Sequence, residues 1–282
     1  MKGVKERGYT MSGDLHLHSR YSDGSLDIEQ IAYIASKSSL SHISITDHDC
    51  LDSWNSLSAI SNKYNVNIIS GVELSCMDFK RNRKVHILCY NAKNTDALKS
   101  ICSHVTDSRM NAGEKMTNIV LQKYNIILDL IKKYASYNGC IYKQHVMHAL
   151  MQSGYSTSVY DDLYSYIFSK QTDCGYIKVN YTDVRDAINK IKMSEGKVIL
   201  AHPRCYNSFE LLDELIDENM IDGVEVWHPS NLKKDTEYLF SKVKAHNLIA
   251  TGGSDFHGLY NASPRYIGQF YTPDKYIKML MN

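Results

Sequence analysis

Near its beginning the chain reads Asp14-Leu15-His16-Leu17-His18, which predicts a short strand with histidines at alternate positions. Alternate residues of a strand point to the same face, so His16 and His18 can hold one metal ion together. Asp255 and His257 repeat this spacing near the other end of the chain. A single His-x-His pair is a weak sign of a metal site. The prediction therefore depends on what other strands bring to the same place.

Short apolar runs alternate with helix-like segments around this first strand. Further strands are predicted at 42–46, 67–74, 84–90, 197–201, 223–227 and 248–252, and helices at 27–37, 53–64, 182–194, 208–218 and 232–246. This alternation predicts an α/β fold with a parallel sheet, closed or open. Residues 94–180 look mostly helical and interrupt the alternation. We therefore expect a barrel domain formed by residues 1–93 and 181–282, with 94–180 as an inserted helical subdomain that caps the substrate.

Ionisable residues lie where the predicted strands end. His48 follows the second strand, Glu73 ends the third, His86 lies on the fourth and His202 ends a later one. In parallel β/α folds these ends form the active-site face. Taken alone, His86 would be a satisfied core histidine and Glu73 an ordinary carboxylate. Taken together, so many buried polar groups are costly unless they are paired or bound to metal. Mixed imidazole and carboxylate ligands favour Zn, Mn or Fe.

Composition narrows the class of protein. The chain has 282 residues, a hydrophobic fraction of 43% and a formal net charge of +1, which suits one large domain without a global basic field for nucleic acid. Its seven scattered cysteines, including Cys174, form no Cys-x-x-Cys pair and indicate free thiols in the cytoplasm. Residues 1–13 lack the apolar segment of a signal peptide, and no apolar run is long enough to span a membrane. Nothing indicates an obligate protein partner.

The polar motifs resemble those of the polymerase and histidinol phosphatase (PHP) family of metal-dependent phosphoesterases. The resemblance spans nearly the whole chain in family order. The matching stretches are 14–19 with Ser22-Asp23-Gly24, 45–49, 71–73, 85–88, 201–203 and 252–258.

This resemblance implies a distorted (β/α)7 barrel with three divalent ions, Mn²⁺ above all, with Fe²⁺ or Zn²⁺ as alternatives. His16, His18, Glu73 and Asp255 would hold one ion. Glu73 would bridge to a second ion completed by His86 and His202. Asp23, His48 and His257 would hold the third.

Within the family the chain is most similar to the branch that acts on nucleotide phosphates, including 3′,5′-nucleoside bisphosphates. One basis for this similarity is the helical insertion that follows the His86 strand. The others are three motifs, Tyr142-Lys143-Gln144-His145, Ala201-His202-Pro203-Arg204 and Glu225-Val226-Trp227-His228-Pro229. The branch usually has Arg where this chain has Lys143. Arg binds phosphate as a bidentate fork, whereas Lys acts as a point charge.

The implied reaction is hydrolysis of a nucleotide phosphate monoester by a hydroxide that bridges two ions. Arg204 and Lys143 would add positive charge at the phosphoryl group; the competing interpretations are a surface ion pair for Arg204 and a solvated side chain for Lys143. His228 could protonate the leaving group, line the pocket or cap a turn. Alternative functions are a histidinol-phosphate phosphatase, a 5′-3′ exonuclease on short oligonucleotides and a non-catalytic metal- or nucleotide-binding module. The helical insertion disfavours the histidinol-phosphate phosphatase, and the complete ligand set disfavours the non-catalytic binding module.

Overall fold

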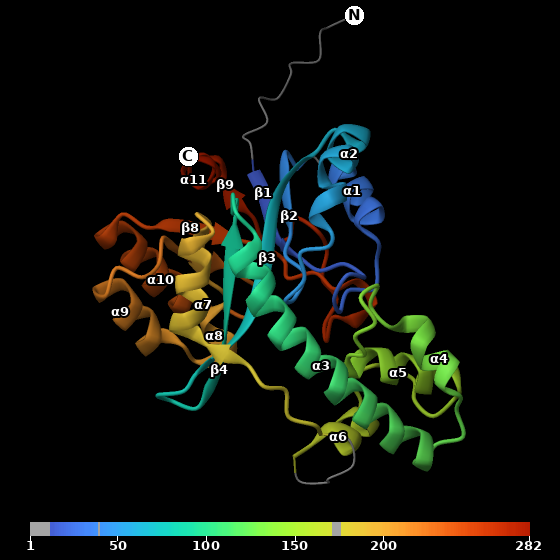
Figure 1. Ribbon diagram of the computed structural model, residues 1–282. Coiled ribbons are helices and arrows are strands. Elements are labelled where there is room, and N and C mark those ends of the chain that lie inside the picture. Colours follow the sequence, from blue (N-terminus) through green and yellow to red (C-terminus); the bar gives the residue numbers. More distant parts are fainter. Residues whose placement is uncertain (1–11, 39, 171–175) are drawn as a thin grey trace, which may run out of the picture.

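A nearly closed, barrel-shaped sheet forms the centre of the protein, with helices around it and a further group of helices beyond one end (Figure 1). The structure is a computed structural model and describes residues 12–38, 40–170 and 176–282. Residues 1–11, part of the segment expected to lack a signal peptide, lie outside the described residues. Cys174, one of the seven expected free thiols, also lies outside them. Within the described part, Cys50, Cys76, Cys89, Cys102, Cys140 and Cys205 are free thiols.

The strands follow the predicted order. They are β1 (Ser12–Leu17), β2 (His42–Ile45), β3 (Asn67–Asp78), β4 (Arg83–Tyr90), β5 (Thr182–Asp183), β6 (Lys197–Leu200), β7 (Gly223–Trp227), β8 (Ile249–Gly252) and β9 (Thr272–Pro273). Their order in the sheet is β8-β7-β6-β4-β3-β2-β1-β9, with β5 beside β3. The mixed α/β class and the distorted barrel of the prediction are confirmed.

The direction of β4 corrects the prediction of a wholly parallel sheet. β4 runs antiparallel to both β3 and β6, whereas β1, β2 and β3 are parallel to one another, as are β6, β7 and β8. Only Phe79–Asn82 separates β3 from β4, and a parallel pair needs a crossover of about a dozen residues or more. Because β4 is reversed, it begins at the end of the sheet where its neighbours β3 and β6 finish, and His86 is presented there.

The barrel nearly closes between β1 and β8. The backbone N–H of His18 donates to the carbonyl of Phe256 at 3.0 Å, and Leu17 and Phe256 form an isolated parallel bridge. Gly253 permits this approach, because a Cβ atom there would lie 2.4 Å from the Cβ of His16. The residues after the two strands are thereby brought together.

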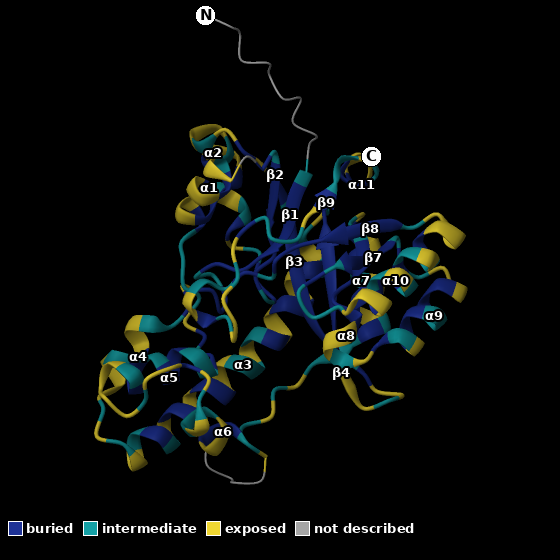
Figure 2. Cartoon of the chain, turned by 180° about the vertical axis from the view of Figure 1, so that it is seen from behind, coloured by how far each residue is buried: buried dark blue, intermediate teal, exposed yellow. Residues whose placement is uncertain are grey.

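Helices cover the outside of the sheet and bury their apolar faces against it. They are α1 (Ile28–Lys37), α2 (Trp54–Tyr64), α7 (Val184–Met193), α9 (Phe209–Asp217), α10 (Lys233–His246) and α11 (Asp274–Met281). Ile31, Ile188, Leu212 and Leu239 are fully buried at these contacts. Figure 2 shows the strands buried and the exposed residues on the outer helix faces. The short helix α8 (Pro203–Tyr206), the 3-10 turn η1 (Gly258–Tyr260), β9 and α11 were not predicted. The predicted helix 182–194 begins two residues later than expected, because Thr182 and Asp183 form β5.

The segment between β4 and β5 is helical, as expected. It contains α3 (Asp96–Lys123), α4 (Leu128–Tyr134), α5 (Lys143–Gln152) and α6 (Asp162–Phe168). These helices have their own apolar cluster, which includes Val120, Ile131, Val146 and Leu150 and extends to Tyr260 of the η1 turn. They lie beyond the end of the barrel at which β1 and β2 finish (Figure 1). None of the described helices is both long and apolar enough to cross a bilayer.

Candidate metal centre

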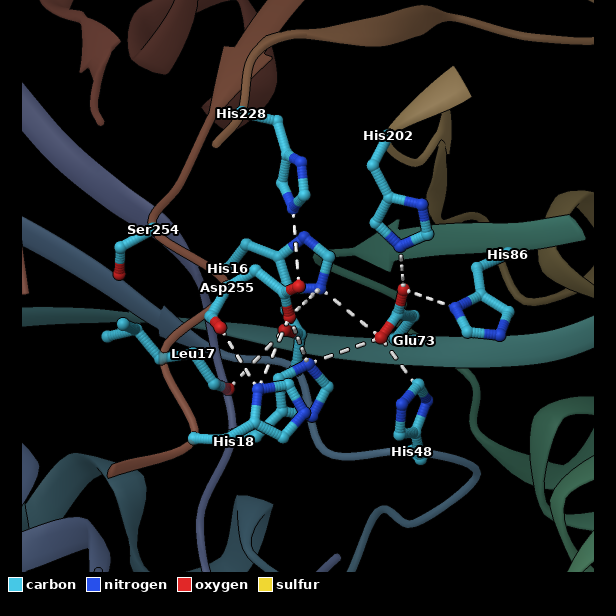
Figure 3. A network of polar contacts seen from close by, with 12 residues as sticks. His16, Leu17, His18, His48, Glu73, His86, His202, His228, Ser254 and Asp255 are labelled. Atoms are coloured by element: carbon cyan, nitrogen blue, oxygen red, sulfur yellow. Dashed lines mark hydrogen bonds and ion pairs between the residues drawn. The ribbon is translucent and has the colours of Figure 1, made fainter. Parts of the chain in front are cut away.

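All nine predicted ligand positions meet at one end of the barrel. His16 lies on β1, Glu73 on β3 and His86 on β4, and the others lie in the loops that follow β1, β2, β6 and β8. Figure 3 shows most of these side chains directed toward Glu73 and Asp255. The local groups able to hold an ion include His18, Asp23, His48 and His257; His16, His18 and Asp255; His16, Glu73 and His202; and His48, Glu73 and His86.

Glu73 lies in the middle of this cluster. Its Oε1 is 2.8 Å from Nδ1 of His86 and 2.7 Å from Nε2 of His202. Its Oε2 is 3.2 Å from a ring nitrogen of each of three further histidines, which are His16, His18 and His48. Five imidazoles therefore surround one buried carboxylate, and these donors form candidate groups for metal binding.

Two aspartates complete the cluster on the side of β8. Oδ1 of Asp255 lies 3.3 Å from Nε2 of His18 and 3.6 Å from Nε2 of His16. Oδ1 of Asp23 lies 3.2 Å from Nε2 of His257 and 3.6 Å from Nδ1 of His18. The predicted groups of ligands are therefore spatial neighbours.

The histidine nitrogens of the cluster are better suited to binding metal ions than to forming hydrogen bonds with the neighbouring side chains. The ring nitrogens Nε2 of His16, Nε2 of His18 and Nδ1 of His48 are buried and lack a hydrogen-bond partner. An unpaired buried polar atom costs free energy, and native proteins rarely leave one without a compensating role. Three such atoms converge on the same Glu73 oxygen. Neutral imidazole nitrogens and carboxylates are the donors that Mn, Fe or Zn accept.

The charges of the cluster compensate one another. Burial alone would raise the pKa of Glu73, but His86, His16 and His48 hold it well below its ordinary value. Burial alone would lower the pKa of His18, but Asp255 and Glu73 raise it to about 10. The pKa of His48 is well below normal because burial dominates there. The raised pKa of His18 and the lowered pKa of Glu73 both follow from the attraction between opposite charges in this buried cluster.

The loops that carry the ligands are held in unusual backbone conformations. Asp49, His202 and Asp255 have positive φ angles of 51°, 23° and 50°. Such conformations cost of order 1–3 kcal/mol in non-glycine residues and gather at functional sites. Gly24 also shapes one of these loops, because it allows the chain to pass close to His18. A Cβ atom at position 24 would lie 2.3 Å from the carbonyl oxygen of His18.

Glu225 is a buried carboxylate to which the sequence patterns assigned no role. Its Oε1 lies 2.9 Å from Nδ1 of His16, and its Oε2 accepts the backbone N–H of His202 at 2.8 Å. It therefore orients one predicted ligand through its ring and another through its backbone. A charged residue at the centre of the apolar strand Gly223–Trp227 was the available signal.

Asp255 has two further polar neighbours, on the oxygen that faces away from His18. Oδ2 accepts from Nη1 of Arg265 at 2.9 Å and lies 3.3 Å from Nε2 of His228. The His228 side chain is fully buried, and its other nitrogen lies 2.7 Å from Oγ of Ser230. Burial lowers the pKa of His228. Arg265 had no distinctive sequence signal, because it belongs to a loop with no regular pattern.

Within the described part of the chain, the two predicted cationic residues form no ion pair with the nine predicted ligands. Arg204 follows Pro203 in the first turn of α8; its side chain is 42% exposed and forms an ion pair of 3.5 Å with Asp235. The ammonium group of Lys143 lies 5.5 Å from the ring centre of Phe168 and 5.4 Å from that of Tyr176. Burial lowers the pKa of Lys143, and Lys84 and Lys170 lower it further.

The inserted helices reach the cluster through the residue after Lys143. Nε2 of Gln144 donates to Oδ2 of Asp23 at 2.9 Å. Sequence reasoning assigned no role to Gln144, because only the docking of α5 against the barrel brings it to Asp23. The insertion thus touches a predicted metal ligand directly.

Known proteins with related sequences share this pattern. A family profile described as "PHP domain" matches residues 14–193. The phosphoribosyl 1,2-cyclic phosphate 1,2-diphosphodiesterase of Eggerthella lenta is 31% identical, over 90% of this chain and 97% of that protein. The 5′-3′ exoribonuclease Rnm of Escherichia coli strain K12 is 28% identical over 90% and 88%. The 3′,5′-nucleoside bisphosphate phosphatase of Chromobacterium violaceum is 25% identical over 86% of each chain.

A solved structure agrees with the fold. The crystal structure of a candidate metal-dependent phosphoesterase from Bifidobacterium adolescentis superposes with a TM-score of 0.83, covering 95% of each chain at 25% sequence identity. The likeness extends over the barrel and the insertion together.

Proposed function

The chain belongs to the PHP domain family of metal-dependent phosphoesterases, and from this we propose that it hydrolyses phosphate monoesters of nucleotides, such as 3′,5′-nucleoside bisphosphates or AMP-like monophosphates. The observation that carries the proposal is the convergence of five imidazoles on Glu73, three of them through buried nitrogens that lie 3.2 Å from its Oε2 without forming a hydrogen bond. A binding module would have no need of so many buried, mutually compensating donors. A phosphoesterase needs them to position divalent cations.

Three divalent ions, with Mn²⁺ the foremost candidate, are part of the proposal. The nine ligands are His16, His18, Asp23, His48, Glu73, His86, His202, Asp255 and His257. Ions bound there would supply Lewis-acid activation of water and neutralise the phosphoryl oxygens. Glu225 holds His16 in its tautomer and orientation. Asp255 is held in turn by Arg265 and His228, which favours a positioning role for the enclosed His228 over protonation of the leaving group.

We further propose that segment 94–180 acts as a substrate cap. Gln144 joins it to Asp23, and the hydroxyl of Tyr160 donates to the carbonyl of Tyr260 at 3.0 Å. Arg204, with its exposed and long ion pair, is free to exchange Asp235 for a substrate phosphate. Lys143 would contribute as a cation held over aromatic rings. If so, Lys143→Arg should raise the activity on bisphosphates more than on monophosphates.

Phosphate release from a panel of esters tests the proposal. The purified protein with Mn²⁺ is assayed on a 3′,5′-nucleoside bisphosphate, nucleoside monophosphates, short oligoribonucleotides, histidinol phosphate and a ribose cyclic phosphate. We expect the nucleotides to be the best substrates. Preference for the cyclic phosphate or for oligonucleotides would shift the assignment toward the activities named for the relatives. Release from none of them would refute it.

Matched histidine variants test the ligand set. His16→Ala should lose both activity and bound metal while the protein stays folded, because a buried ligand is removed without adding bulk. His104→Ala, at an exposed position of α3, should retain both. A fully active His16→Ala variant would contradict the proposed site.

A further inference from the structure

A cavity of about 300 Å³ lies between the inserted helices and the barrel loop that follows β8. One wall is formed by His148 and Met151 of α5 and by residues 157–160 of the following loop. The other wall is formed by residues 259–262. The volume is at the lower end of the range of about 300–1,000 Å³ that is usual for ligand pockets.

The cavity adjoins the metal centre. Its wall 259–262 begins two residues after His257, and Asn261 ties this wall to the ligands. Oδ1 of Asn261 accepts the backbone N–H of His257 at 2.8 Å, and Nδ2 donates to the carbonyl of Asp255 at 3.0 Å. A molecule whose phosphate lies at the cluster could therefore extend into the cavity.

The two walls are fastened to each other. The Tyr160 hydroxyl donates to the carbonyl of Tyr260, and Nδ1 of His148 lies 2.9 Å from the Tyr260 hydroxyl. The His148 ring also stacks on Tyr134 with ring centres 3.8 Å apart. Burial raises the pKa of Tyr160, and the charges of Asp23 and Asp255 raise it further, consistent with a position near the cluster. The cavity is thus built from fixed side chains on both sides.

The lining combines flat apolar surface with polar atoms. Tyr160 and Leu259 remain 37% and 72% exposed although both are large and apolar. Thr157 and Ser158 add hydroxyl groups, and Nε2 of His148 has no partner within the described part of the chain. A nucleobase has the same two properties, because its faces stack on aromatic rings and its edge forms hydrogen bonds.

We infer that this cavity binds the nucleobase of the substrate while the phosphate lies at the metal centre. The inference rests on the proposed function and deepens it, because it assigns a place for the base. A second phosphate is a poor occupant, since none of the lining residues within the described ranges is Lys or Arg. A sugar phosphate without a base would leave the cavity empty.

Two substrates that differ only in the base test the inference. AMP and ribose 5-phosphate carry the same phosphoribose, so their ratio of kcat/KM measures what the base contributes. In the wild type we expect AMP to be preferred by roughly ten- to a hundred-fold, the range that corresponds to the stacking of one base. Equal kcat/KM values for the two compounds would overturn the inference and leave the phosphoesterase assignment intact.

Exposed residues on the two walls allow the cavity to be filled without disturbing the core. Ala262→Trp on the barrel side and Ser158→Trp on the cap side should each lower the AMP to ribose 5-phosphate ratio at least tenfold. The matched control is Ser263→Trp, which adds the same ring at an exposed neighbouring position that does not line the cavity. Its ratio should equal that of the wild type. Loss of preference in all three variants, or in none, would contradict the assignment.

A binding measurement separates this inference from the proposed function. Adenosine, which has no phosphate, is titrated calorimetrically into the wild type and the Ala262→Trp variant. Binding to the wild type that weakens at least tenfold in the variant would support the cavity even if no ester were hydrolysed. Absence of adenosine binding to the wild type, together with normal hydrolysis of AMP, would refute the cavity and retain the phosphoesterase.

Discussion

At the scale of single residues, Glu225 contacts two of the proposed ligands, His16 and His202, and is not itself one of the nine proposed ligands. Its two oxygens reach a ring nitrogen of one histidine and the backbone N–H of the other. Its negative charge also favours the protonated N–H of His16 on the side facing away from Glu73. We therefore propose that this carboxylate determines which His16 nitrogen is available for metal.

We expect Glu225→Gln to weaken metal binding about 10- to 100-fold, because the amide keeps the shape but loses the charge that orients His16. Metal content after dialysis against graded chelator concentrations measures this effect independently of activity. The control is Glu237→Gln, at a side chain that is 66% exposed on α10. Unchanged metal affinity in Glu225→Gln would show that His16 is oriented by packing alone.

A buried ion pair between Arg109 and Asp49 joins α3 to the loop after β2. Nη2 of Arg109 donates to Asp49 Oδ2 at 2.7 Å and to Ser75 Oγ at 3.1 Å, and the guanidinium lies 4.8 Å from the ring centre of Tyr142. Both charged side chains are almost fully buried. The pair thus links the residue beside His48 to the residue beside Lys143.

Arg109→Met should destabilise the protein by about 3–5 kcal/mol, because it leaves the buried Asp49 charge without its partner. Asp49→Asn combined with Arg109→Met should cost less than the sum of the single substitutions, and Asn tolerates the positive φ at position 49. Urea unfolding measures all three variants. Lys63→Met, which breaks an exposed ion pair with Glu29, should leave the stability unchanged. Additive costs would show that the two side chains do not interact.

Single residues were the most predictable level of this site. The cost of burying imidazoles and carboxylates that recur at successive strand ends indicated a metal site, and the resemblance to the PHP motifs supplied the nine proposed ligand positions. Gln144, Arg265 and the surroundings of Lys143 could not be predicted in this way, since each depends on how a loop or helix docks. The identity of a residue was visible in the sequence, whereas its neighbours were set by tertiary packing.

At the scale of elements, the direction of β4 was predicted wrongly, although the length of the connection before it could have indicated the correct direction. Apolar periodicity is the same for parallel and antiparallel strands, so it predicted the strand without its direction. The connection between the predicted strands 67–74 and 84–90 was already too short for a parallel crossover. By contrast, α8 has only four residues, which is too short for a periodic signal.

The first turn of α5 leads to a prediction about pH. His145 is buried, which lowers its pKa to about 4, and its Nδ1 accepts the backbone N–H of Tyr142 at 3.2 Å. The folded pKa is below the ordinary value of about 6.5. The unfolded chain therefore binds a proton first as the pH falls, and stability decreases below about pH 6.5.

We expect the wild type to lose about 2 kcal/mol relative to His145→Gln between about pH 7 and pH 5. Gln keeps an acceptor for the first-turn N–H but does not titrate. Urea unfolding of both proteins at the two pH values measures the difference. His104→Gln, at an exposed site, should follow the wild type. Parallel pH profiles for wild type and His145→Gln would contradict the burial of a neutral imidazole.

At the scale of the whole molecule, the barrel and the inserted helices meet at the metal centre and form the cavity between them. Sequence patterns divided the chain into these parts but held no information on how they dock. That arrangement follows from contacts such as Gln144 with Asp23 and Tyr160 with Tyr260. Metal binding, histidine protonation and the stability of the whole protein also depend on one another.

In the metal-free protein, His18 lies within ion-pair distance of two buried carboxylates, Glu73 and Asp255. Because the folded pKa of His18 is raised to about 10, its contribution to stability is fully present below about pH 6.5 and is lost as the pH rises toward 10. Metal binding needs the neutral ring and releases the proton, so the affinity for metal increases over the same interval. Metal and protons therefore compete for one set of side chains.

Stabilisation by Mn²⁺ should consequently grow with pH. At a free ion concentration of about 100 times Kd, bound metal adds about 2.7 kcal/mol, which for a chain of this size corresponds to a rise in Tm of roughly 5–10 °C. We expect the difference in Tm between Mn²⁺-loaded and EDTA-treated protein to be clearly larger at about pH 8.5 than at about pH 6.5, with proton release on metal addition measured in weakly buffered solution. A difference in Tm that is the same at both pH values, without proton release, would mean that the His18 ring is already neutral before metal binds.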